Sequence, residues 1–337
     1  MTADTTHTPQ DVTSSDEASD RVLEVTDLKV HIPVRMGMRK VTVKAVDGVS
    51  FTLERGRTLG VVGESGCGKS TTARAVMRLE EPTNGSVRLL GKDITHLSGE
   101  AMRSMRRHCQ MVFQDPYSAL NPRLTVGQIV AEPMQAQGMN RADITARVEE
   151  LLDLVGLQPR HRNAFPHQFS GGQRQRIGTA RALSTHPEVL ILDEPVSALD
   201  VSVQAQVVNL FRDLQEQFEM GMIFISHDLS VVRHVSDDVV VMYLGQIVER
   251  GPAEAVLSTP HHPYTEALIS AAPGHDDGGE RRQRIVLTGE VPSPVDPPAG
   301  CRFRSRCWKA TPECEQPPPL AVPEGGTHEV ACFHPAL

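Results

Sequence analysis

The sequence lacks three features that would each assign it to a broad class of protein. Lys and Arg number 34 against 42 Asp and Glu, a net charge of −8, so no basic excess favours nucleic acid as a partner. No apolar run approaches the roughly 20 residues that a membrane-spanning helix needs. The N-terminus shows no basic and then apolar pattern of a secretory signal. These absences predict a cytosolic chain, unless another component holds it at a membrane.

Cysteine is scarce outside one short segment. Four of the six cysteines fall within 32 residues with the spacing C-x5-C-x6-C-x17-C: Cys301, Cys307, Cys314 and Cys332. In a cytosolic chain, cysteines are better explained as thiols or metal ligands than as disulfides. The cluster predicts one site for zinc or an iron–sulfur cluster, with free thiols or a disulfide as the alternative. Structural zinc usually favours pairs two to four residues apart, which this segment lacks.

The remaining composition is that of a folded globular protein. The chain has 337 residues, of which 39% are hydrophobic and 23% charged, enough for one large α/β domain plus an appendage. Residues 1–20 differ, because they carry five acids and no Lys or Arg among mostly polar residues. Such a segment cannot bury enough apolar area to become ordered. We therefore expect a disordered tail over 1–20.

Strand and helix patterns alternate along the chain. Strand patterns cover 22–32, 41–53, 58–62, 86–90, 109–114, 188–193 and 222–226. Between the first two, residues 33–40 predict a gap, and Asp47-Gly48 predicts a turn inside the second. Helical patterns cover 70–79 and 98–107, and residues 115–183 are mostly helical. This alternation predicts an α/β fold with a mainly parallel sheet and a helical insertion.

Two helices show a clear apolar face. One face carries Ile144, Val148, Leu151, Leu152 and Val155, at i, i+4, i+7, i+8 and i+11. A second helix begins at Asp200 as its N-cap, and its face carries Val203, Val207, Leu210, Phe211 and Leu214. Both faces predict helices that pack on the α/β core.

The most informative stretch is Gly63–Thr71, with the spacing G-x-x-x-x-G-K-[ST] between a strand and a helix. Its glycines allow a tight turn that points backbone N–H groups inward, and the helix start adds positive potential. Lys69 can reach a terminal phosphate, and Ser70 can bind a magnesium ion. We call this stretch the phosphate loop, and it predicts a bound nucleoside triphosphate.

Polar residues that follow other strands fit the same ligand. Asp193 and Glu194 end a buried strand, where Asp193 can hold magnesium and Glu194 can act as general base toward water. His227 follows another strand and can contact a γ-phosphate, whereas a lone His is more often structural. Gln114 offers a neutral amide to metal and water. Two acids that simply end a strand remain the alternative.

A second anion-binding helix start occurs at Phe169–Arg176. Ser170 can cap a helix whose first turn exposes glycine N–H groups. One nucleotide does not need two such sites, so the second one makes sense if it serves a triphosphate held by another subunit. An ordinary capped helix with a basic face is the alternative.

Together these motifs resemble the ATPase subunit of an ATP-binding-cassette (ABC) transporter over residues 22–260. The motifs are Gly63–Thr71, Gln114, Phe169–Gln173, Asp193–Glu194, Ser197–Asp200 and His227, in the order of that family. The resemblance implies a P-loop NTPase, an ABC nucleotide-binding domain over 21–257. That domain has a RecA-like core, an antiparallel β subdomain and a helical subdomain at 115–183. A small C-terminal extension with the four cysteines follows at 258–337.

The resemblance also implies residue roles. ATP would contact Gly63, Glu64, Ser65, Gly66, Cys67, Gly68, Lys69, Ser70, Thr71 and Gln114, with Mg²⁺ held by Ser70, Gln114 and Asp193. Catalysis would fall to Glu194 and His227. The signature Ser170, Gly171, Gly172 and Gln173 would close on the ATP of the opposite subunit, and Asp200 would link the two sites. Adenine usually stacks on an aromatic residue in this family, but here only His31 or Ile32 stands at that position.

Finer motifs narrow the resemblance to dipeptide and oligopeptide importers, and within them to the second ATPase subunit. They are Asp115–Arg123, Asp193–Ser202 and His262–Tyr264 with the extension. Implied partners are a similar second ATPase, two membrane permease subunits and, indirectly, an extracellular peptide-binding protein. Nucleic acid is not among them. The chain would be peripheral, at the cytoplasmic face of the cell membrane. Similar extensions carry a [4Fe–4S] cluster, with Zn²⁺ as the alternative.

Two other functions remain open. Nickel and other small-solute importers share this architecture. A soluble ABC ATPase that acts on nucleic acid or ribosomes belongs to another class, but such proteins generally carry two cassettes or long coiled-coil inserts. This chain has one phosphate loop and no basic stripe.

Overall fold

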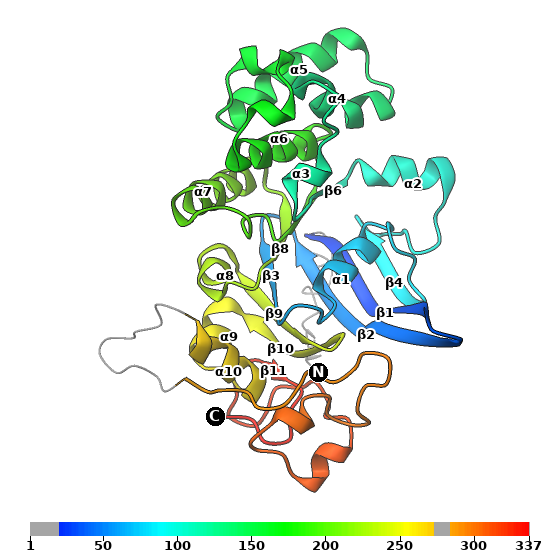
Figure 1. Ribbon diagram of the computed structural model, residues 1–337, viewed down its shortest axis with the longest axis vertical. Helices are drawn as coiled ribbons and strands as arrows, with labels where there is room; N and C mark the ends of the chain where they lie inside the picture. The colour runs from blue at the N-terminus through cyan, green and yellow to red at the C-terminus, as the bar shows by residue number, and fades with distance from the viewer. Residues whose placement is uncertain (1–19, 273–283, 337) are drawn as a thin grey trace, which may run out of the picture.

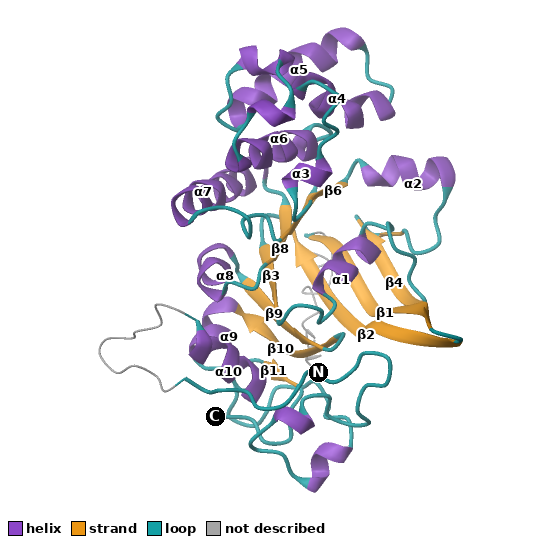
Figure 2. Ribbon diagram, in the orientation of Figure 1, coloured by secondary structure: helices purple, strands orange, loops and turns teal. Residues whose placement is uncertain are grey.

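Two β-sheets organise the part of the chain that the computed structural model describes, residues 20–272 and 284–336 (Figure 1). The expected tail lies outside these residues, apart from Asp20. Helices gather at one end of the molecule, the sheets occupy the middle, and a loop-rich C-terminal segment closes the other end (Figure 2). Among the described residues, no helix is both long and apolar enough to cross a membrane.

The larger sheet carries the strands that end at the predicted site. Its order is β11-β10-β9-β3-β8-β7-β6, and β6, β7, β8, β3 and β9 run parallel. The strands are β3 (Thr58–Val62), β6 (Cys109–Val112), β7 (Val189–Asp193), β8 (Gly221–Ile225), β9 (Asp238–Tyr243), β10 (Gln246–Pro252) and β11 (Glu329–Val330). Every residue of β3, β7 and β8 is buried, as expected for parallel strands covered on both faces. The mainly parallel sheet is therefore confirmed.

Alternate residues of these strands supply two separate cores. In β7, Leu190 and Leu192 belong to the core shared with the helices, whereas Val189 and Ile191 belong to the core shared with the second sheet. This division follows from the two-residue period of a strand, which sends successive side chains to opposite faces. The larger sheet thus lies between two apolar layers, and its ends are the places where polar groups reach the surface.

The second sheet is antiparallel and has the order β2-β1-β4-β5. Its strands are β1 (Arg21–Met36), β2 (Arg39–Glu54), β4 (Asn84–Leu89) and β5 (Lys92–Asp93). The predicted gap at 33–40 is wrong, because β1 continues through Pro33 and a tight turn at Gly37-Met38 leads into β2. β4 pairs with β1 only as far as Lys29, so Pro33 lies where β1 pairs with β2 alone, a position that tolerates proline.

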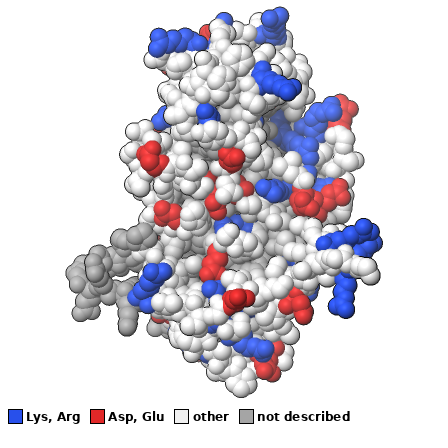
Figure 3. Space-filling view, viewed as in Figure 1, with Lys and Arg blue, Asp and Glu red and all other residues white. Residues whose placement is uncertain are grey.

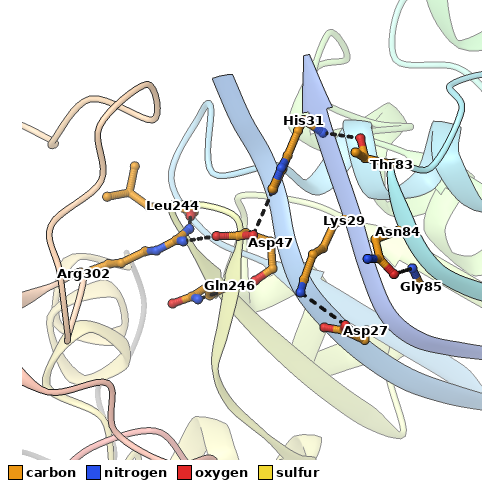
Figure 4. A network of polar contacts seen from close by, with 10 residues as sticks. All are labelled: Asp27, Lys29, His31, Asp47, Thr83, Asn84, Gly85, Leu244, Gln246 and Arg302. Carbon is orange, nitrogen blue, oxygen red and sulfur yellow. Dashed lines mark hydrogen bonds and ion pairs between the residues drawn. The ribbon is translucent and has the colours of Figure 1, made fainter. Parts of the chain in front are cut away.

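The predicted turn at Asp47-Gly48 is a β-bulge within continuous β2. Leu28 pairs with Val49 and Lys29 pairs with Asp47, so the register shifts by one residue at Gly48. Gly48 has φ 92°, a left-handed conformation that glycine adopts without penalty. The bulge turns the Asp47 side chain toward His31 and the C-terminal segment (Figure 4).

Helices cover the larger sheet and form the separate helical part. They are α1 (Lys69–Val76), α2 (Gly99–Arg106), α3 (Pro116–Ala119), α4 (Val126–Ala136), α5 (Arg141–Leu154), α6 (Gly171–Leu183), α7 (Val201–Phe218), α8 (Leu229–Val235), α9 (Ala253–Ser258) and α10 (Pro263–Ala271). Helices α3 to α6 lie within 115–183. The predicted face of α5 is buried from Ile144 to Leu152, and Val155 at its C-cap is buried too.

The described residues of the C-terminal extension pack back onto the larger sheet. Strand β11 pairs with β10. The ring of Phe303 is buried, and its centroid lies 5.3 Å from that of the Tyr243 ring and 5.4 Å from that of the Tyr264 ring. Deeper still, the buried Glu249 carboxylate hydrogen-bonds His328 at 2.6 Å and accepts from the backbone N–H groups of His261 and His262. A buried charge persists only with such partners, so this contact joins the extension firmly to β10.

Replacing Phe303 by Ala should lower the stability of the whole chain by about 3–5 kcal/mol, because a buried aromatic ring is lost. Urea denaturation of the full chain measures the effect. Phe165→Ala is the matched control, since Phe165 is 37% exposed and should cost far less. If the main unfolding transition of Phe303→Ala coincides with that of the wild type, the extension does not share the core of the domain.

Candidate active site

The phosphate loop connects β3 to α1, at the carboxyl end of the larger sheet (Figure 1). A Cβ atom added to Gly63 would lie 2.3 Å from the Met242 carbonyl oxygen, and one added to Gly68 would lie 2.3 Å from that of Ala45. Their φ angles of 151° and 107° also favour glycine. These two glycines therefore bring the loop close to the backbone of β9 and β2, as no larger residue could.

Lys69 is the first residue of α1 and lies beneath the loop. Its side chain is buried, and Nζ donates to the carbonyl oxygens of Gly63 at 2.7 Å and Glu64 at 3.1 Å. The positive end of α1 adds to this charge, so the loop combines backbone N–H groups, a helix start and a cation. Such a combination suits a phosphate chain.

Ser70 and Asp193 meet beside the loop, although they are 123 residues apart. The Ser70 hydroxyl donates to Asp193 Oδ1 at 2.8 Å. Burial raises the pKa of Asp193, while the Ser70 hydrogen bond and the positive charges of Arg74 and Lys69 oppose that rise. A hydroxyl and a carboxylate oxygen are hard ligands of the kind that Mg²⁺ prefers, and Mg²⁺ usually keeps several waters. The pair therefore fits the predicted magnesium site.

Two further predicted residues, Gln114 and His227, converge on Glu194. Gln114 Nε2 donates to Glu194 Oε2 at 3.0 Å, and His227 Nδ1 lies 3.5 Å from the same oxygen. Glu194 has φ 46°, a conformation that non-glycine residues adopt rarely and that often marks functional sites. Its backbone N–H donates to the Ile225 carbonyl oxygen, so β8 holds it in place. Strands β6, β7 and β8 thus bring an amide, a carboxylate and an imidazole together.

The predicted signature lies elsewhere in the fold. Ser170 caps α6 in a reciprocal arrangement, accepting from the Gln173 N–H while Gln173 Oε1 accepts from the Ser170 N–H. Gly172 faces α7, where a Cβ would lie 2.4 Å from Val203 Cγ1. Figure 1 shows α6 in the helical part, away from the loop before α1. The roles of Ser170, Gly171, Gly172 and Gln173 toward a second subunit stay predictions.

Asp200 is the N-cap of α7, as expected. It accepts from the Val203 N–H at 3.0 Å and from the Ser202 hydroxyl at 2.7 Å. These hydrogen bonds, that of Ser202 foremost, hold the pKa of Asp200 below its usual value. Its predicted role between two sites is untested.

His31, proposed as a surface for adenine, has a partner of its own. His31 Nε2 lies 2.9 Å from Asp47 Oδ1, and its backbone N–H donates to the Thr83 hydroxyl (Figure 4). Ile32 packs at the border of the core between the two sheets. Whether either residue contacts a base is not decided by these contacts, so both stay predictions.

The predicted iron–sulfur or zinc site is wrong. Within residues 20–272 and 284–336, no group of three or more His, Cys, Asp or Glu side chains is placed to hold a metal ion. Cys301, Cys307, Cys314 and Cys332 instead line a small, mainly apolar pocket as free thiols. Burial raises the pKa of the Cys301, Cys307 and Cys332 thiols, the last to about 11, as expected for thiols that line an apolar pocket.

Two contacts to the phosphate loop were not foreseen. The Tyr264 hydroxyl accepts from the Glu64 backbone N–H at 2.7 Å, and the Arg306 guanidinium binds the Glu64 carboxylate at 2.6 and 3.0 Å. These partners lie 200 and 242 residues from Glu64. Local patterns carry no signal for such contacts, because the partners are far apart in the sequence and meet only in the folded chain.

Comparisons with known proteins agree with this geometry. The profile of the ABC transporter family matches residues 46–197, and that of the oligopeptide/dipeptide transporter C-terminal region matches residues 248–314. The oligopeptide transport ATP-binding protein AppF of Bacillus subtilis is 53% identical over 92% of this chain and 96% of its own length. The oligopeptide transport ATP-binding protein OppF of Salmonella typhimurium is 52% identical over 93% and 96%. The di/tripeptide transport ATP-binding protein DppF of Pseudomonas aeruginosa is 50% identical over 93% and 97%.

Solved structures match the ATPase part of the chain. The dimeric, post-hydrolysis structure of the ATP-binding cassette MJ0796, bound to ADP and Pi, superposes with a TM-score of 0.61 at 26% identity. It covers 68% of this chain and 98% of its own. The structure of cbiO1 from Clostridium perfringens gives a TM-score of 0.62 at 27% identity, covering 71% and 91%. The fold and the phosphate-loop motif agree with these matches, and the chain belongs to the ABC transporter ATPases, in the family of oligopeptide and dipeptide transport ATP-binding proteins.

Proposed function

We propose that this chain binds ATP with Mg²⁺ at the phosphate loop and hydrolyses it to power the import of dipeptides or oligopeptides through a membrane permease. The observation that carries the proposal is the convergence of the Ser70–Asp193 pair and the Gln114–Glu194–His227 group at one edge of the sheet. The printed functions of the relatives supply the substrate class.

The loop offers each part of a triphosphate a suitable group. Backbone N–H groups between Gly66 and Thr71 and the start of α1 suit the phosphate oxygens. Lys69 suits the terminal phosphates, once Nζ exchanges the Gly63 and Glu64 carbonyl oxygens for them. Ser70 and Asp193 would hold Mg²⁺, with Gln114 nearby. When bound, the metal neutralises charge on the β- and γ-phosphates.

Hydrolysis requires a base close to the γ-phosphate, and Glu194 has the position for it. Its carboxylate accepts from Gln114, its backbone N–H donates to β8, and the carboxylate would take the proton of the attacking water. His227 is 61% exposed and can approach the γ-phosphate from the side of Glu194. The proton moves from water to Glu194 Oε2 as the water oxygen bonds to phosphorus and the β–γ bridging oxygen leaves with ADP.

The second anion-binding helix start suits a head-to-tail pair of ATPases. In that pair, Ser170–Gln173 of this chain would contact the ATP held by the partner, and Asp200 would connect the two sites. A similar but non-identical ATPase is the proposed partner. The dimeric ATP-binding cassette MJ0796 supports such a pairing in a protein of the same fold.

Permease contact is proposed for the region after β6. Gln114 lies in the segment between β6 and α3, and Tyr117 in α3 is 64% exposed beneath the guanidinium of Arg174. An exposed aromatic ring on a short helix suits a protein partner. In this arrangement the chain works at the cytoplasmic face of the membrane beneath two permease subunits, fed from outside by a peptide-binding protein.

The alternatives are weaker. Nickel or another small solute is less favoured, because the relatives quoted above are all peptide transport proteins. A soluble ATPase on nucleic acid would need a basic surface. On the face shown in Figure 3, basic groups lie over the helical end, near α2 and at the tip of the β1–β2 hairpin, and acidic and uncharged groups separate them. This face therefore carries no continuous basic surface for nucleic acid.

Lys69→Ala should weaken ATP binding by the full chain by about 10–100-fold, because the cation beneath the phosphates is lost. Isothermal titration calorimetry with Mg-ATP measures this affinity. Lys92→Ala, at an exposed position of β5, is the control and should bind like the wild type. Unchanged affinity in Lys69→Ala would refute the assignment of the loop.

Glu194→Gln should lower ATP turnover of the assembled transporter by at least about 100-fold while ATP binding is retained, because the general base is removed and the shape is kept. Phosphate release and nucleotide binding are measured on the same preparation. Glu216→Gln, on the exposed face of α7, is the control. Turnover equal to that of the wild type would show that this site is not the hydrolytic one.

Affinity purification of this chain from its native membrane should recover two membrane proteins and a second, related ATPase in fixed proportion. Size-exclusion chromatography and mass spectrometry establish the composition. Peptide uptake by vesicles that contain the complex then tests the substrate, with Ni²⁺ as the competing solute. Recovery of a soluble homodimer bound to nucleic acid would overturn the importer.

A further inference from the structure

Glu64 of the phosphate loop is held by two residues of the C-terminal extension. Its backbone N–H donates to the hydroxyl of Tyr264 in α10, and its carboxylate binds the guanidinium of Arg306. Arg306 is the last residue of a short 3₁₀ helix, Arg304–Arg306. Both the backbone and the side chain at position 64 therefore depend on a segment that belongs to none of the ATP motifs.

The Arg306 contact has the geometry of a strong ion pair. The guanidinium is only 7% exposed, and two of its nitrogens meet the two carboxylate oxygens of Glu64 at 2.6 and 3.0 Å. It also donates to the Tyr243 hydroxyl at 3.4 Å. The hydrogen bonds to Glu64 raise the pKa of Arg306 further, so its charge is permanent. A planar, two-pronged contact fixes the direction of a carboxylate more strictly than a lysine could.

Position 64 matters because it adjoins the groups that would meet phosphates. Lys69 Nζ donates to the Glu64 carbonyl oxygen at 3.1 Å and to that of the preceding Gly63 at 2.7 Å. The next residues, from Ser65 to Thr71, carry the inward N–H groups. A rotation of the Glu64 peptide would therefore move the carbonyl oxygen that accepts from Lys69 Nζ, and it would also move the first residues of the loop.

We propose that Arg306 is a positioning residue for the phosphate loop, through which the C-terminal extension sets the affinity of this chain for ATP. Arg306 contacts no phosphate itself; it acts through Glu64. The proposal rests on the proposed function, because it concerns the ATP site assigned to Gly63–Thr71. Its physical basis is preorganisation, since a loop already held in its binding conformation loses less entropy when the ligand binds.

A second arginine of the same segment contacts residues close to the loop, and Figure 4 shows it with its partners Asp47 and Leu244. Arg302 donates to Asp47 Oδ2 and to the Leu244 carbonyl oxygen. The adjacent Gly245 donates its N–H to the Cys67 carbonyl oxygen in the phosphate loop at 2.8 Å. Burial would raise the pKa of Asp47, but the hydrogen bonds from His31 and Arg302 outweigh it and keep the carboxylate charged. The extension thus contacts the surroundings of the loop at two points.

A purely structural role for Arg306 would be to attach the extension to the domain. That task is already met by other contacts, namely Phe303 on Tyr243 and Tyr264, His328 with Glu249, Arg302 with Asp47, and β11 on β10. Loss of the Arg306 ion pair should therefore leave the extension in place while the loop relaxes. This difference separates positioning from attachment.

Arg306→Met removes the charge and keeps most of the length of the side chain. In the full chain, it should weaken Mg-ATP binding about tenfold by isothermal titration calorimetry, the scale of one charge-assisted hydrogen bond. Hydrogen exchange should rise in residues 63–69 and stay unchanged in β11. The control is Arg304→Met, because Arg304 is half-buried in the same turn and pairs with Glu315 at 3.3 Å, away from the phosphate loop. It should bind ATP like the wild type.

Two more variants keep the test decisive if Arg306→Met folds poorly. Arg306→Lys retains the charge without the two-pronged contact and should fall between wild type and Arg306→Met. The exchange Glu64→Arg with Arg306→Glu should recover part of the affinity that either single change loses. In the assembled transporter, the KM for ATP should rise in Arg306→Met with little change in kcat, as expected when binding alone is weakened.

The outcomes distinguish this inference from the proposed function. If the wild type binds Mg-ATP, Lys69→Ala binds it more weakly, and Arg306→Met binds it like the wild type, Arg306 does not position the loop and the inference is overturned. A lower melting temperature with unchanged ATP affinity overturns it as well, since Arg306 would then only attach the extension. If the wild type itself binds no ATP, the proposed function has failed instead.

Discussion

The parallel pairing of β3, β8 and β7 is the constraint on which the rest of the structure depends. Val61 pairs with Ile225, and Ile225 pairs with Asp193, so the carboxyl ends of the three strands are aligned. The chain beyond those ends then supplies the phosphate loop, Glu194 and His227 side by side. A slip of one residue in either pairing would exchange the side chains between the two apolar layers, disturb the packing of both, and shift these groups apart. The apolar runs of these strands, buried on both faces, therefore hold the site in register.

Local sequence carries the central site well, because each part is a short pattern with one physical explanation. Gly63 and Gly68 lie where only glycine fits against Met242 and Ala45. The spacing of the phosphate-loop motif by itself predicts this turn. The Ser70–Asp193 and Gln114–Glu194 contacts follow from strand ends in a parallel sheet, so residues far apart in sequence could be expected together. The amphipathic face of α5 follows from its period of 3.6. The roles predicted for Ser170 and Asp200 concern contacts with a second subunit, which the structure of one chain does not contain, so they stay predictions.

The sequence-based predictions that the structure contradicts have physical reasons too. The sequence predicts an end of the strand near Pro33 and a turn at Gly48. In the structure, β1 continues past Pro33 because it pairs with β2, and Gly48 is the extra residue of a β-bulge. The cysteine spacing shows that four thiols lie near one another along the chain, yet a metal needs their sulfur atoms to converge as thiolates. Packing around Phe303 and burial of the thiols favour a small apolar pocket instead. Sequence proximity does not determine where side chains point within a loop-rich segment.

Arg306 and Tyr264 show what the motifs of a family leave undescribed. The nucleotide motifs specify which groups meet a phosphate, but a glycine-rich loop has many accessible conformations, so its affinity depends on what restricts it. Here the restriction at Glu64 comes from an appendage that joins the sheet through β11 and the buried Glu249–His328 contact. Attachment to β10 is not enough to hold the loop, because the extension must also be rigid. The buried contacts among the rings of Tyr243, Tyr264 and Phe303 provide that rigidity. A rigid extension can therefore support the geometry of the ATP site through the contact of Arg306 with Glu64.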